Sequence, residues 1–109
     1  MATKKVLDQS VKTRAKKYRD LLEKSGVKIK TLYVFGSYAK GKARKWSDID
    51  VAVVSSDFKS DRHDERVRLM DYSDQIDDFI EPHPFTPEEF EDKYYPLARE
   101  VKRTGIKIE

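Results

Sequence analysis

The sequence predicts an α/β (α+β) fold in which helices flank a small mixed β-sheet, within one domain spanning residues 1–109. Apolar runs at residues 32–35 and 49–55 have the length and the β-rich composition of buried strands. Between residues 8 and 24, apolar residues instead recur at helical spacing. A chain of 109 residues can bury one hydrophobic core and has no room for a second.

The first helix is expected to begin at a cap formed by Asp8 or Ser10, since either side chain can accept hydrogen bonds from free main-chain N–H groups. It should run to about Lys24, where the pair Ser25-Gly26 ends it. An apolar stripe along this helix is predicted to pack against the sheet. The stripe consists of Val11, Ala15, Tyr18 and Leu22, flanked by Leu7 and Leu21.

The first strand is predicted over residues 27–35 and the second over residues 49–55, followed by a polar loop at 56–60. A second helix should cover residues 61 to about 76. We expect Val67 and Met70 on its buried side, and Leu69, Ser73 and Ile76 are further candidates.

The third strand should run from residue 78 or 79 to residue 83. Its two prolines confine its end to a sheet edge or a bend, because proline cannot donate to the ladder. The segment at 86–89 then predicts a helix start, with Thr86 as cap, Pro87 in the first helical position and Glu89 closing a capping box. Phe90 and one of the tyrosines at 94 and 95 should face inward.

The C-terminal segment predicts one more helix over residues 97–104, after Pro96 interrupts the preceding one. Leu97 and Val101 should lie on its buried side, and Gly105 should end it. Residues 106–108 are interpreted as a last short edge strand or an interface.

A Gly-Ser pair ends the first predicted strand. Gly36 lets the backbone bend sharply and lie close to a bulky ligand, while Ser37 offers a hydroxyl and a main-chain N–H. If a short helix begins at Ser37, its free N–H groups and its dipole point at the same place. These features predict a phosphate-binding turn.

Two carboxylates begin the next strand. Asp48 and Asp50 are two residues apart, so on a strand both side chains leave one face, with Cα atoms about 6.5 Å apart. Carboxylates held this close repel each other unless a cation lies between them. Hard oxygen ligands suit Mg²⁺, which takes substrate phosphates among its other ligands. The pair therefore predicts a metal site.

The connection between the two motifs is basic. One or two of its cations are expected to offset the charge of a triphosphate, and the others to face solvent. These cations are Lys40, Lys42, Arg44 and Lys45. Trp46, the only tryptophan, either stacks on a base or covers the loop. Ser47 is expected to cap the turn into the strand and to orient Asp48 by a local hydrogen bond.

The joint spacing resembles a known family. Gly36-Ser37, ten residues, and then Asp48-Ile49-Asp50 is similar to the signature of the DNA polymerase β-like nucleotidyltransferase superfamily. The small size resembles its minimal nucleotidyltransferases. The compact motif covers residues 34–54, and a weaker likeness extends to the end of the chain. The resemblance implies a polymerase β-like nucleotidyltransferase fold.

The resemblance also implies roles for individual residues. Those assigned to a nucleoside triphosphate, typically ATP, are Gly36, Ser37, Lys40, Arg44 and Ser47. Asp48 and Asp50 are implied to be catalytic and to hold one or two Mg²⁺ ions. Relatives carry a third carboxylate on a neighbouring strand, and Glu81 is the best match for this catalytic and metal-binding position.

Two acidic residues near Glu81 remain alternatives for the third carboxylate, Asp77 and Asp78. Asp78 would lie on the other face of the strand from Glu81, so only one of these two can point into the site. His83 shares a face with Glu81, where it either borders the acceptor or is a structural imidazole. His63 is expected to be a surface histidine.

The implied reaction is Mg²⁺-dependent transfer of a nucleoside monophosphate, AMP from ATP, to an acceptor hydroxyl. In this subgroup the transferase is commonly paired with a separate helical HEPN toxin and acts as its antitoxin by adenylylating a tyrosine. The toxin carries an Arg-x₄₋₆-His motif, and no arginine precedes His63 or His83 at that spacing. This chain would therefore be the transferase of such a pair.

Charge is unevenly distributed along the chain. Residues 1–47 carry 14 Lys or Arg against 3 Asp or Glu, whereas residues 48–109 carry 9 against 17. The basic half could attract nucleotide phosphates, nucleic acid or an acidic partner.

Two alternative functions stay open. One is a catalytically weak nucleotide-binding or inhibitory partner of a toxin, and the other, less favoured, is a nucleic-acid-binding module.

Composition also bears on location. The absence of cysteine excludes disulfides and thiolate metal sites and suits a reducing compartment. No run approaches ~18 apolar residues, and no apolar signal-peptide core follows the first five residues. We therefore expect a cytoplasmic protein without membrane contact, and a homo-oligomer remains open.

Overall fold

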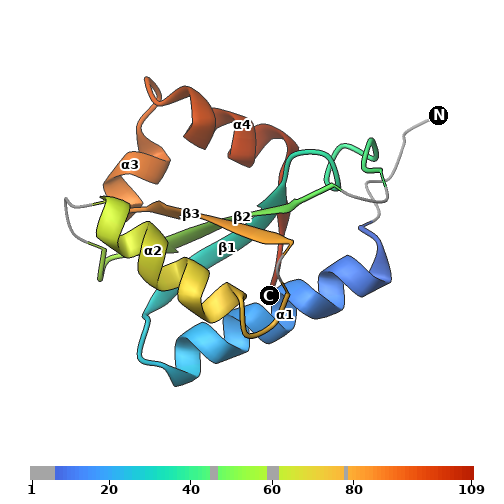
Figure 1. Cartoon of the computed structure of the whole chain (residues 1–109). Coiled ribbons are helices and arrows are strands. Elements are labelled where there is room, and N and C mark those ends of the chain that lie inside the picture. The colour runs from blue at the N-terminus through green and yellow to red at the C-terminus, as the bar shows by residue number, and fades with distance from the viewer. Residues whose placement is uncertain (1–6, 45–46, 59–61, 78) are drawn as a thin grey trace.

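The computed structural model describes residues 7–44, 47–58, 62–77 and 79–109 (Figure 1). Helices and strands alternate irregularly along this part of the chain. In chain order they are α1 (Gln9–Lys24), β1 (Ile29–Phe35), β2 (Ile49–Ser55), α2 (Arg62–Ser73), β3 (Ile80–Phe85), α3 (Pro87–Glu91), α4 (Pro96–Thr104) and β4 (Ile106–Lys107). Most predicted boundaries are correct to within two residues.

The four strands form one sheet in the order β3-β2-β1-β4. Strand β1 pairs antiparallel with both β2 and β4, whereas β2 and β3 are parallel. The predicted mixed sheet flanked by helices is therefore confirmed. The last segment, β4, pairs with β1 as a short edge strand, which was one of the two predictions for residues 106–108.

The two faces of the sheet carry different helices (Figure 1). One core contains the apolar stripe of α1, Leu69 of α2 and the β2 residues Ile49, Val51 and Val53. The other contains Ala52 and Val54 of β2, together with apolar residues of α3 and α4. Because residues two apart share a face, Asp50 belongs to the face that α3 and α4 cover.

Helix α2 presents a different face to the core than the sequence predicted. Leu69 and Ser73 are each 1% exposed, whereas Val67 and Met70 are 44% and 42% exposed, so the expectation for the latter two was wrong. Both stripes have helical spacing, and packing against α1 selects between them. The helix also ends at Ser73 rather than near residue 76.

The segment after β3 follows the predicted capping pattern. The Thr86 hydroxyl accepts a hydrogen bond from Glu89 N–H, and the Glu89 carboxylate accepts one from Thr86 N–H, which completes the capping box.

Strand β3 extends to Phe85, beyond the predicted end at residue 83, and its prolines lie on an edge strand. Tyr95 packs in the second core, whereas Tyr94 is 81% exposed.

Helices α1 and α2 are joined by a buried hydrogen bond. The Tyr18 hydroxyl donates to the Leu69 carbonyl oxygen over 2.8 Å. Burial raises the pKa of Tyr18 well above its ordinary value, so its hydroxyl stays a donor at neutral and mildly alkaline pH. In the part of the chain that the structure describes, we find no helix with the length and apolar character needed to cross a membrane.

The Tyr18→Phe variant should lose about 1 kcal/mol of unfolding free energy, because it removes this buried hydrogen bond and leaves the ring in place. The measurement is the urea concentration at the midpoint of unfolding, compared between variants whose unfolding free energies depend on urea with the same slope. Tyr94→Phe is the matched control, since Tyr94 is 81% exposed, and it should change stability by less than about 0.5 kcal/mol. Equal midpoints for the two variants would contradict the assignment.

Candidate active site

The connection after β1 begins with a tight turn. Gly36 has a φ of 75°, and Lys40 N–H donates to its carbonyl oxygen over 3.0 Å. The short helix considered from Ser37 does not form, because the chain makes consecutive turns over residues 36–41 instead. Gly41, with a φ of 71°, ends this turn region in the left-handed conformation that commonly terminates a helix.

Gly36 lies directly against the Asp50 carboxylate. Strand pairing sets Phe35, the preceding residue, opposite Asp50. A β-carbon added at Gly36 would come within 2.4 Å of Asp50 Oδ2. Position 36 therefore requires glycine for two reasons, the positive φ and the missing side chain. The predicted phosphate turn and one predicted metal ligand thus form one continuous surface.

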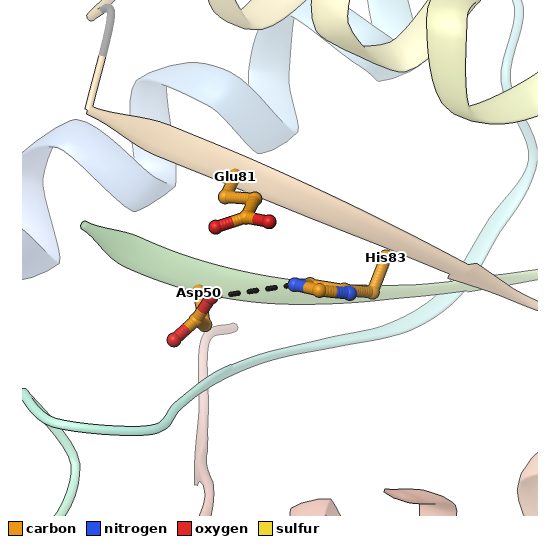
Figure 2. Close-up of side chains that lie close together, drawn as sticks. All are labelled: Asp50, Glu81 and His83. Carbon is orange, nitrogen blue, oxygen red and sulfur yellow. Dashed lines mark hydrogen bonds and ion pairs between the residues drawn. The ribbon is translucent and has the colours of Figure 1, made fainter.

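Two further polar side chains of β3 reach the Asp50 carboxylate (Figure 2). In the parallel register Asp50 lies opposite Glu81, and His83 follows two residues later on the same face. His83 Nε2 is 3.3 Å from Asp50 Oδ1. One ligand atom from each of the three residues lies within 4.8 Å of the other two.

Neighbouring side chains hold this group in place. Arg66 of α2 donates to Glu81 Oε1 from Nη2 over 2.8 Å, which offsets charge beside the two carboxylates. The Phe35 ring lies edge-on to the His83 imidazole, with centroids 5.1 Å apart. Nothing in the local sequence pattern singled out Arg66, because it approaches Glu81 from a different element.

The first aspartate of the predicted pair is not a member of this group. Asp48 is exposed and immediately precedes β2, which begins at Ile49 as predicted, so of the two aspartates Asp50 alone lies within the strand. Among the described residues, the mutually close donor group contains Asp50, Glu81 and His83, without Asp48. Pairing with β3 starts at Ile49, and this sets the strand boundary between the aspartates.

The alternatives to Glu81 lie elsewhere. Asp77 forms an ion pair with Arg14 of α1, and its Oδ1 accepts a hydrogen bond from Phe79 N–H. Its carboxylate is therefore engaged on the α1 side of the molecule. Asp78 lies outside the described residues. Glu81 is the candidate that the structure brings to Asp50.

Among the described residues, the basic connection makes contacts to α4 and within itself. Lys40 Nζ lies 3.4 Å from Glu100 Oε1 of α4, which ties the glycine turn to that helix. Ser47 closes a turn with Arg44, because its hydroxyl accepts from Arg44 N–H over 2.8 Å and its own N–H donates back over 3.0 Å. That contact replaces the expected one to Asp48. Lys42 is exposed, and the predictions for residues 45 and 46 lie outside the described residues.

A cavity of about 310 Å³ adjoins the acidic group. It is lined by His83, a member of that group, and by Arg66, which bonds to Glu81, and it extends between α2, β3 and the start of α4. Its remaining lining residues are His63, Pro84, Phe85, Tyr95 and Leu97. The expected surface position of His63 is confirmed, since it is exposed at the rim.

The donor set fits a divalent cation. Two carboxylates and one imidazole converge from two neighbouring strands, and carboxylate oxygens are preferred ligands of Mg²⁺ and Mn²⁺. The glycine turn beside Asp50 lets a bulky anionic group approach the same place. The arrangement can therefore hold a cation next to a phosphate chain.

Solved structures share the fold of this chain. A candidate nucleotidyltransferase from Sulfolobus solfataricus is 19% identical, with a TM-score of 0.66 over 90% of this chain and 78% of that one. A toxin–antitoxin complex with AMP-PNP contains a chain that is 24% identical, with a TM-score of 0.60 and coverages of 87% and 72%. A structure of a tri-AMPylated Shewanella oneidensis HEPN toxin in complex with MNT antitoxin contains a chain that is 21% identical. Its TM-score is 0.55 over 91% of this chain and 71% of that one.

None of the curated proteins compared with this chain matches it. A family model described as the nucleotidyltransferase domain matches residues 14–106. This match spans both motifs and every strand of the sheet except the last residue of β4. The chain therefore belongs to the nucleotidyltransferase domain family.

Proposed function

We propose that this protein transfers AMP from ATP, in the presence of Mg²⁺, to a hydroxyl of a partner protein of the HEPN toxin type, and so acts as an antitoxin. The observation that carries the proposal is the contact between Gly36 and the Asp50 carboxylate. It joins a turn suited to phosphate with a carboxylate suited to a metal, which is the pairing that nucleotidyl transfer needs.

The structural neighbours support this choice of donor and partner. One is described as a toxin–antitoxin complex with AMP-PNP, and another as a tri-AMPylated HEPN toxin bound to an MNT antitoxin. Family membership supports nucleotidyl transfer in general, and these two descriptions favour AMP and a HEPN protein.

The phosphates are assigned to the glycine turn. In this proposal Gly36 and Ser37 bind the β and γ phosphates through main-chain N–H groups and the hydroxyl, as backbone at a tight turn commonly does. Lys40 and Arg44 offset the remaining negative charge. Lys40 would exchange its contact with Glu100 for the phosphates, since that contact is long and exposed. Ser47 holds the Arg44 backbone in position.

Asp48, Asp50 and Glu81 are assigned to one or two Mg²⁺ ions, with Asp48 at the exposed side. When bound, the metal stabilises charge that develops on the attacking and leaving oxygens around the α phosphorus. The protein contributes orientation, because parallel pairing sets Asp50 opposite Glu81 and the missing β-carbon of Gly36 leaves room for the Asp50 carboxylate.

The acceptor is assigned to the cavity beside β3. It is lined by His83 and by Arg66, which bonds to Glu81, and its four other lining residues within β3 and at the start of α4 offer an apolar and aromatic surface for a side chain of the acceptor. In this proposal the acceptor hydroxyl loses its proton and bonds to the α phosphorus, and the bond from that phosphorus to the bridging oxygen breaks, so that pyrophosphate leaves.

The function is tested with ATP labelled at either the α or the γ phosphorus, incubated with the pure protein, Mg²⁺ and a lysate of the source cells. AMP transfer labels a partner protein from α-labelled ATP only, and that protein can then be identified. Label from γ-labelled ATP would contradict the proposal by indicating a kinase. Tight ATP binding without labelled product would favour the catalytically weak, inhibitory alternative.

Replacing both aspartates, Asp48→Asn with Asp50→Asn, should lower AMP transfer by more than about a hundredfold, because neutral amides bind Mg²⁺ poorly. Incorporation of α-labelled AMP into the partner measures this loss. Asp20→Asn is the matched control, since Asp20 is exposed on α1 and lies outside both motifs. Equal activity of the double variant and the control would refute the metal assignment. If the double variant still binds nucleic acid in a salt-dependent way, the alternative function as a nucleic-acid-binding module would be favoured.

Gly36→Ala should lower AMP transfer on the order of a hundredfold, because its β-carbon displaces the Asp50 carboxylate from its position. Gly26→Ala provides the control, since Gly26 has a φ of 94° but no atom within 4 Å of an added β-carbon. Both variants carry backbone strain of about 1–2 kcal/mol, so their melting temperatures should fall alike. Activity that falls equally in both would show that strain alone is responsible.

A further inference from the structure

His83 lies beside the two carboxylates of the proposed metal site. Its Nε2 faces Asp50 Oδ1 at 3.3 Å, and both belong to the mutually close donor group with Glu81 (Figure 2). We propose that His83 is a nitrogen ligand of the divalent cation at Asp50 and Glu81, so that the site favours ions that accept imidazole, with Mn²⁺ above Mg²⁺. The residue set implied by the sequence motif contains oxygen donors alone.

The spacing of the donors supports coordination. Two ligands bound at right angles, each about 2.1 Å from a metal, lie about 3 Å apart. The separation of 3.3 Å between His83 Nε2 and Asp50 Oδ1 is close to that value. The Glu81 carboxylate completes a group whose ligand atoms lie within 4.8 Å of one another. A cation can therefore enter with small side-chain movements.

The strands and their neighbours position these donors in advance. Glu81 and His83 are two apart on β3, so they share the face on which Asp50 of β2 lies. The Phe35 ring contacts the His83 imidazole edge-on at 5.1 Å and restricts its rotation. Arg66 holds Glu81 through Oε1, and Oε2 remains available for a second contact. Fixed donors lower the ordering cost of binding.

The choice of metal follows from the donor type. Mg²⁺ prefers oxygen ligands and retains water, whereas Mn²⁺ and the later first-row ions also accept imidazole nitrogen. A neutral His83 with its proton on Nδ1 presents the Nε2 lone pair to the cation. Loss of His83 should therefore weaken Mn²⁺ binding much more than Mg²⁺ binding. A simple hydrogen bond between His83 and Asp50 predicts no such difference.

The chain suits a direct spectroscopic test because it contains only two histidines, His63 and His83. Electron spin echo spectra of the Mn²⁺-loaded protein should show coupling to a directly bound imidazole ¹⁴N. That signal should vanish in His83→Ala and persist in His63→Ala, since His63 lies at the cavity rim. A wild-type spectrum without this coupling would overturn the proposal, as would a signal that depends on His63 instead.

Affinities provide a second, independent measure. In calorimetric titrations without nucleotide, His83→Ala should weaken Mn²⁺ binding about tenfold or more and change Mg²⁺ binding less than about threefold. His83→Gln serves as a larger replacement, and circular dichroism checks the fold of both variants. Equal weakening for the two metals would overturn the nitrogen-ligand assignment.

This inference shares Asp50 and Glu81 with the proposed function, but its test needs neither ATP nor an acceptor. If AMP transfer fails while the ¹⁴N coupling is present, the metal site stands and the reaction is wrong. If transfer succeeds without the coupling, the reaction stands and His83 is not a ligand.

Discussion

The close contact between Gly36 and the Asp50 carboxylate is the constraint on which the site depends. It arises from antiparallel pairing that sets Phe35 opposite Asp50 and from the positive φ of the residue that follows Phe35. With a side chain at position 36, the carboxylate and the turn could not occupy neighbouring positions. The site is therefore a property of strand register and of one missing β-carbon, and the helices contribute mainly by supporting the sheet.

Parallel pairing of β2 with β3 creates the second constraint, because it sets the Asp50 and Glu81 carboxylates side by side. Two like charges this close destabilise the folded chain unless cations or donors offset them. Arg66 bonds to Glu81 and His83 faces Asp50, so each acid has a neighbour of its own. The exposed position of the Arg66–Glu81 pair limits its contribution to about 1 kcal/mol or less, whereas His83 and Asp50 are partly buried.

Much of the fold was predictable because its signals are local. Signals within a few residues of one another predicted the α1 stripe, the two long strands and the capping box at Thr86. These signals are the spacing of apolar residues and the residue types at the ends of helices and strands. The buried face of α2 was not predictable, because apolar residues recur at helical spacing along two of its faces. Only the packing of the folded chain selects between these faces. At the site, the motif indicated Gly36 and Asp50. Strand alternation also placed Glu81 and His83 on one face, whereas their approach to Asp50 depends on strand register and the contact of Arg66 depends on the docking of α2, for which the sequence has no local sign.

Two charged groups of the site, Lys40 and Glu81, already have oppositely charged partners in the free chain, which separates function from stability. Lys40 faces Glu100 at 3.4 Å and Arg66 bonds to Glu81 at 2.8 Å, and all four side chains are between 37% and 43% exposed. Pairs of this kind are weak, so phosphate can replace Glu100 at Lys40 at little cost. In the proposed reaction, the nucleotide displaces Glu100 from Lys40, while a cation binds Glu81 through Oε2 because Arg66 bonds to Oε1. Both steps leave the two hydrophobic cores untouched, so a chain that has lost its ligands should remain folded.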